Sequence, residues 1–141
     1  MKDWMEVEHR HSDGMVDTYQ AEDLIMNVGK AQMAGLLNSV VTTPFKWIAV
    51  GTVATINSAT ATQMQAEVQR LTASVSRVTT NVTNDTSRLE ATFDFGGSFA
   101  IKESGVFDDD TSGNMLARQT FAVLNVEDGD SLTFRWNVVF Q

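Results

Sequence analysis

Residues 131–140 read SLTFRWNVVF, and every second residue from Leu132 to Phe140 is apolar. Successive side chains of a strand point to opposite faces of a sheet, so these apolar residues share one face. Mostly polar residues stand between them. A strand with one apolar and one polar face packs on a core on one side and meets solvent on the other. The stretch predicts a half-buried strand that ties the end of the chain into an antiparallel sheet.

Five further segments upstream have a strand-like pattern, and turn-forming residues separate most of them. Turns are expected at 84–85, 96–97, 108–114 and 127–130, where Asn, Asp, Ser and Gly gather. The strand-like segments are 45–51, 68–82, 89–95, 99–107 and 115–126. Within 68–82 the apolar residues change from odd-numbered to even-numbered positions near Ser76-Arg77, so they would move to the other face of the strand. This change of parity predicts a β-bulge there.

A long helix is predicted ahead of the strands. Asp17 and Gln20 have the spacing of a capping box, and the helix is expected to end before Thr43-Pro44. Apolar residues recur at steps of three and four, as on one face of a helix: Ala21, Leu24, Ile25, Val28, Ala31, Gly35 and Leu36. The predicted fold is mainly β, an antiparallel β-sandwich or open barrel of about six strands with one long N-terminal helix.

Residues 1–16 are expected to form an extended N-terminal arm, with a short strand outside the core as the alternative, and residues 17–141 a single domain. The arm carries Trp4, Met5 and Val7 among charged residues. An apolar residue on such an arm can order on a neighbouring subunit. Met26, Met33 and Leu37 widen the apolar stripe of the helix enough to predict burial against a partner chain. These six residues are the predicted assembly contacts.

Composition excludes several classes of function. The chain has 141 residues, no Cys and a net charge of −8. No disulfide, thiolate zinc site or thiol nucleophile is possible, and an acidic chain is a poor binder of nucleic acid. The first six residues lack the basic start and apolar run of an export signal, and no stretch is apolar over a membrane-spanning length. We expect synthesis in a cytoplasm, with neither nucleic acid nor membrane as a partner.

Two weak metal candidates follow from the sequence. His9 and His11 stand at i and i+2, so they share a face of an extended chain, and Asp13 or Asp17 would complete the ligand set. The alternative is a solvated arm. Asp108 and Asp110 resemble half of a calcium loop, but the remaining ligand spacing is absent, and a charged turn is the alternative. No cofactor is predicted.

The sequence gives little support for a catalytic site. The sequence contains no G-x-S-x-G motif, and its only two histidines lie in the expected arm. Glu90 and Glu103 are conceivable as a carboxylate pair, but no sequence feature places them face to face. The chain is therefore predicted not to be an enzyme.

Glu103 has a structural interpretation instead. It shares its parity with Phe99, Ile101 and Phe107 and therefore lies on the apolar face of its strand. A buried carboxylate needs a cation or hydrogen-bond donors. The candidate partners are Arg70 and Arg118, and the predicted contact fixes the register of the sheet.

Several stretches together resemble a known group of proteins. They are KAQMAGLL (30–37) followed by FKWIAVGT (45–52), then QAEVQR (65–70), then IKESGVF (101–107), MLARQTF (115–121) and GDSLTFRWNVVF (129–140). Their order and spacing over residues 28–140 are similar to those of small structural proteins of tailed bacteriophages and related viruses. Members of this group are tail-fibre, baseplate or collar-fibre domains, and some are head fibres or capsid decorations. Val53 stands where the group has a second Gly, and Val106 where it has Leu.

The resemblance implies a non-enzymatic virion protein that assembles as a homo-oligomer, with a trimer favoured, and contacts other virion proteins. A tail or baseplate fibre component is the first expectation and a capsid decoration protein the alternative. A carbohydrate-binding β-sandwich is a second alternative, since sugars stack on exposed rings. Trp47 and Trp136 lie on apolar faces, so Trp4 is the ring expected to be exposed. Within a fibre, the 108–114 loop could contact a host glycan.

Overall fold

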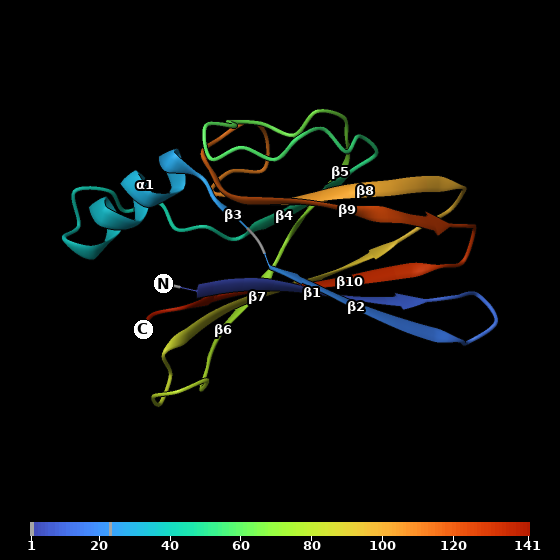
Figure 1. Ribbon diagram of the computed structural model, residues 1–141, viewed down its shortest axis with the longest axis horizontal. Helices are drawn as coiled ribbons and strands as arrows, with labels where there is room; N and C mark the ends of the chain where they lie inside the picture. Colours follow the sequence, from blue (N-terminus) through green and yellow to red (C-terminus); the bar gives the residue numbers. More distant parts are fainter. Residues whose placement is uncertain (1, 23) are drawn as a thin grey trace.

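Two antiparallel sheets of five strands each and one short helix make up the described residues, 2–22 and 24–141, of the computed structural model (Figure 1). The first sheet has the strand order β2-β1-β10-β7-β6, and the second has the order β3-β9-β8-β4-β5. The elements are β1 (Lys2–Arg10), β2 (Val16–Glu22), β3 (Leu24–Ile25), α1 (Asn27–Leu37), β4 (Trp47–Gly51), β5 (Glu67–Thr72), β6 (Ser74–Val78), β7 (Thr86–Asp94), β8 (Phe99–Phe107), β9 (Met115–Val126) and β10 (Ser131–Val139).

The main hydrophobic core contains residues from both sheets, which face each other in Figure 1. The alternation predicted for β10 is confirmed: Leu132, Phe134, Trp136 and Val138 are all buried in this core. β10 lies in the middle of the first sheet, between β1 and β7. Phe140 was expected on the same face, but it lies beyond the end of the strand and is 58% exposed.

The predicted N-terminal arm is wrong. Residues 2–10 form β1, which pairs with β10 on one side and with β2 on the other. Met5 and Val7 are 1% and 2% exposed and belong to the core. Glu6, which lies between them, and Glu8 point to the opposite face of the sheet, as expected for a strand with period two. The charges concealed this alternation, which is the same pattern that identified β10.

The long helix is also wrong. Residues from Val16 to Glu22 form β2, and α1 begins only at Asn27 and has 11 residues. Asp17 is therefore not a helix cap. Val16, Thr18 and Tyr19 are residue types that favour strands, and pairing with β1 decided the outcome. α1 packs on β9, where a Cβ on Gly29 would collide with the backbone of Leu116.

The parity switch in 68–82 marks a change of sheet. β5 belongs to the second sheet and β6 to the first, and the chain passes between them at Ala73. The buried Ala73 donates its N–H to the carbonyl of Lys46 at 2.7 Å. The bulge predicted near Ser76-Arg77 is not the cause, because β6 pairs with β7 in an unbroken register.

Candidate functional site

His9, His11 and Asp130 meet at one end of the two-sheet body, and we call them the histidine cluster. His9 lies near the end of β1, His11 begins the turn to β2, and Asp130 ends the turn between β9 and β10. The pairing of Arg10 with Ser131 brings these two turns together. Figure 1 shows this end opposite the one that carries the described chain ends and α1.

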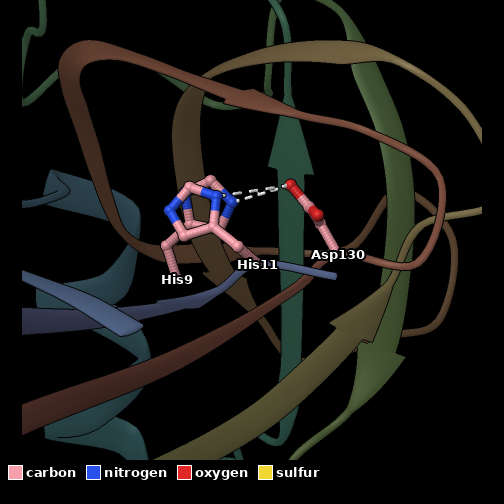
Figure 2. A group of neighbouring side chains, drawn as sticks. All are labelled: His9, His11 and Asp130. Atoms are coloured by element: carbon pink, nitrogen blue, oxygen red, sulfur yellow. Dashed lines mark hydrogen bonds and ion pairs between the residues drawn. The ribbon is translucent and has the colours of Figure 1, made fainter. Parts of the chain in front are cut away.

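Both histidines direct a ring nitrogen at the same carboxylate oxygen (Figure 2). His9 Nε2 lies 3.0 Å from Asp130 Oδ2, and His11 Nδ1 lies 4.0 Å from it. The two imidazole rings stack with their centroids 3.9 Å apart and their planes at 27°. His9 and Asp130 are buried, whereas the side chain of His11 is 34% exposed. The cluster therefore has one side open to solvent.

Hydrogen bonds fix the Asp130 carboxylate in both turns. Oδ1 accepts the Ser12 N–H at 2.9 Å, and Oδ2 accepts the Glu127 N–H at 3.1 Å. The hydrogen bond with His9, followed by these two backbone contacts, lowers the pKa of Asp130 below its usual value. The carboxylate is ionised at neutral pH and joins the β1–β2 turn to the β9–β10 turn.

Asp17 orients the second histidine. Its Oδ2 lies 2.7 Å from His11 Nε2, and this hydrogen bond is the main cause that raises the pKa of His11. Because a carboxylate only accepts, Nε2 carries the proton and Nδ1 faces Asp130. Asp13, the other acid predicted for this site, instead accepts the N–H of Met15.

The three ligand atoms of the histidine cluster all lie within 4.8 Å of one another, a spacing at which a metal ion can be held. Sequence reasoning found both histidines but missed Asp130, which it had placed in an acidic turn. Asp130 lies 121 positions from His9 in the sequence. The two residues come together because β1 pairs with β10 in this register. The register was not predictable once residues 1–16 had been assigned to an arm.

Asp108 has a different role, and Asp110 is exposed in the same turn. Asp108 Oδ2 accepts the amide of Gln32 at 2.6 Å, and Oδ1 accepts the N–H of Asn114 at 2.7 Å. These contacts connect the 108–114 turn to α1. Neither acid belongs to a group with metal-ligand spacing among residues 2–22 and 24–141.

Glu103 pairs with Arg118, one of its two predicted partners. Arg118 Nε and Nη2 lie 2.9 and 2.7 Å from Glu103 Oε2, and both residues are at most 1% exposed. The other oxygen, Oε1, accepts the N–H of Ala66 at 3.1 Å. The pair joins β8 to β9 with its polar groups satisfied, as a buried ion pair requires. Arg70 instead pairs with Glu67, at 2.7 Å.

Three of the six predicted assembly contacts are unavailable to a partner. Met5, Val7 and Met26 are buried in the cores of this chain, so that prediction is wrong for them. Met33 is partly buried, and Leu37 is 91% exposed at the end of α1.

Met33 and Leu37 line an apolar groove of about 380 Å³ between α1 and the adjoining ends of both sheets. Its lining is Met33, Leu36, Leu37, Pro44, Phe45, Ser87, Leu89, Leu116, Val138 and Phe140. Trp4 lies elsewhere, partly exposed beside a polar hollow.

Comparison of the chain with protein-family models, with curated proteins and with solved structures found no match. Within the described part of the chain, no helix has the length and apolar character needed to cross a membrane.

Proposed function

We propose that this chain is a non-enzymatic β-sandwich protein of a tailed-phage-like virion, and that copies of it assemble through the apolar groove into a homo-oligomer, with a trimer favoured. The observation that carries the proposal is the exposed apolar surface at the groove. Leu37 is 91% exposed and Phe140 58%, and both border a groove lined almost entirely by apolar side chains. Contiguous apolar surface of this kind is typical of protein interfaces.

The charge of the chain favours association through this patch. At a net charge of −8, two copies repel each other, and apolar contact has to outweigh that repulsion. Neither Leu37 nor Phe140 is charged, and the ten residues that line the groove include no acid. Copies that meet at the groove therefore bring none of its lining residues into like-charge contact.

The residues that carry the resemblance to phage proteins support a structural role. Glu103 and Arg118 come from two of the resembling stretches and pair with each other. A Cβ on Gly51, from a third stretch, would collide with Glu103. Trp136, from a fourth, donates its indole N–H to Ser104 at 3.3 Å. These motif residues meet in the interior, where they hold the fold together.

The virion role is tested by counting copies of the chain in purified particles. We expect peptide mass spectrometry on particles from the virus or prophage that encodes the chain to detect it in a fixed ratio to the major capsid protein. A few copies per particle indicate a tail or baseplate component, and a ratio near one per capsid subunit indicates the alternative, a capsid decoration protein. Absence of the chain from intact particles would contradict the proposal.

A second candidate function, carbohydrate binding, is favoured by the surroundings of Trp4. Trp4 lines a hollow of about 570 Å³ together with Gln20, Glu22, Asn81 and Gln141. An indole ring among amide and carboxylate groups is a common arrangement for a sugar, which stacks on the ring and hydrogen-bonds at its edge. If this function holds, a glycan array should give hits that Trp4→Ala abolishes and that Trp47→Phe, in the second sheet, retains. An array without hits removes this candidate.

A further inference from the structure

We propose that the histidine cluster is a binding site for a first-row transition-metal dication of the Zn²⁺ class, with His9 Nε2, His11 Nδ1 and Asp130 Oδ2 as ligands. This site goes beyond the proposed virion role and does not depend on it. Imidazole nitrogens suit Zn²⁺, Cu²⁺ and Ni²⁺, whereas Ca²⁺ and Mg²⁺ prefer sets made of oxygen alone.

The distances fit such an ion. Ligand atoms about 2.1 Å from a tetrahedral zinc ion are about 3.4 Å from one another. The two distances to Asp130 Oδ2, 3.0 Å from His9 Nε2 and 4.0 Å from His11 Nδ1, lie on either side of this value. All three ligand atoms lie within 4.8 Å of one another. To bind a common ion, the two rings, which stack with their centroids 3.9 Å apart, must turn out of their stack.

His11 supplies the strongest argument. Its Nε2 donates to Asp17, so in the neutral ring Nδ1 carries a lone pair. That lone pair faces an anionic oxygen 4.0 Å away, a distance too long for a hydrogen bond. A lone pair directed at a carboxylate is unfavourable unless a cation, either a proton on Nδ1 or a metal ion, lies between the two atoms. A metal ion at this point bonds to both of them.

The groups behind two of the three ligands, His11 and Asp130, are those found behind metal ligands in proteins. Asp17 forms the carboxylate–histidine–metal arrangement that fixes the tautomer and orientation of a ligating imidazole. The N–H groups of Ser12 and Glu127 hold the Asp130 carboxylate from both turns. His9 is buried, and the proton that its Nε2 shares with Asp130 leaves when the metal–nitrogen bond forms. The exposed side of His11 leaves a position for water, as in an open zinc site.

The test is a titration of the full chain with ZnCl2 after treatment with a chelator and without a polyhistidine tag. Because the chain has only two histidines, any histidine-dependent binding reports on this site. Calorimetry should show one Zn²⁺ per chain, and the ring ¹⁵N signals of both histidines should shift. We expect His11→Gln to weaken binding at least 10-fold and Asp17→Asn about 10-fold, the usual effect of losing a group behind a ligand. Asp13→Asn, a neighbouring acid outside the cluster, is the matched control and should bind Zn²⁺ as the unaltered chain does.

Two outcomes would overturn the proposal. Unshifted histidine ring signals at saturating Zn²⁺ would mean that the cluster is a hydrogen-bonded or protonated contact between two turns and no more. Equal Zn²⁺ affinity in the unaltered chain and in Asp17→Asn would do the same. Asp17 is half exposed, so this second comparison holds even if His11→Gln does not fold.

Discussion

At the scale of single residues, the interior contains a buried ion pair between Glu103 and Arg118. Glu103 and Arg118 are both at most 1% exposed, and each has further polar partners, Ala66 for the glutamate and Thr55 for the arginine. Removing one member of such a pair leaves the other charge buried without compensation. The pair joins β8 to β9 in the interior, and we expect this position to tolerate change poorly.

Glu103→Gln should destabilise the protein strongly for this reason. The expected loss in the free energy of unfolding is about 3–5 kcal/mol, measured by urea denaturation at neutral pH. Glu90→Gln is the matched control, because Glu90 Oε2 also lies 2.7 Å from an arginine, Arg135 Nε, but on the partly exposed face of the first sheet. That variant should lose less than about 1 kcal/mol. Equal losses in the two variants would show that burial of the first pair has no special role.

At the scale of elements, the turns determine how the strands connect. Asp85, between β6 and β7, accepts the N–H groups of Thr80, Asn81 and Val82, each at 2.8 Å. These hydrogen bonds, that from Val82 first, lower the pKa of Asp85 far below its usual value. A carboxyl whose pKa is lowered in the folded state stabilises that state above its unfolded pKa of about 3.9, and the contribution is lost as the pH falls below that value.

Asp85→Asn should therefore lower the midpoint of thermal unfolding at pH 7, and the difference from the unaltered chain should shrink between about pH 4 and pH 2. Asp128→Asn, which alters an exposed acid in another turn, serves as the control. A difference for Asp85→Asn that stays constant down to pH 2 would mean that the ionised carboxylate is not what stabilises the turn.

Sequence reasoning identified the elements that have a clean pattern. Alternation found β10, and parity placed Glu103 on the buried face; both follow from the period of a strand. Residues 17–22 and 24–25 were misassigned because apolar residues at steps of three and four occur here in short strands too. Only the pairing of β2 with β1 and of β3 with β9 distinguishes the two cases. The third member of the histidine cluster, Asp130, depends on the register between β1 and β10, which is a property of the folded sheet.

At the scale of the whole molecule, the two ends of the body differ. One end has the histidine cluster, where two turns are tied together by Asp130. The other end carries α1 (Figure 1). The apolar groove lies beside this helix, with Leu37 and Phe140 exposed. This polarity suits a subunit that contacts its neighbours at one end and presents the other end outward.

The central claim is that copies of this chain associate through the groove, and its most direct test is the molar mass in solution by light scattering. We expect the unaltered chain to give three times the mass of one chain, and Leu37→Asp to give a single chain, because a carboxylate in the groove must be desolvated for copies to meet. Ile56→Asp, at a residue that is 94% exposed and does not line the groove, is the control and should keep the oligomer. A single-chain mass for the unaltered protein at every concentration measured would contradict the claim, and so would an oligomer that Leu37→Asp leaves intact.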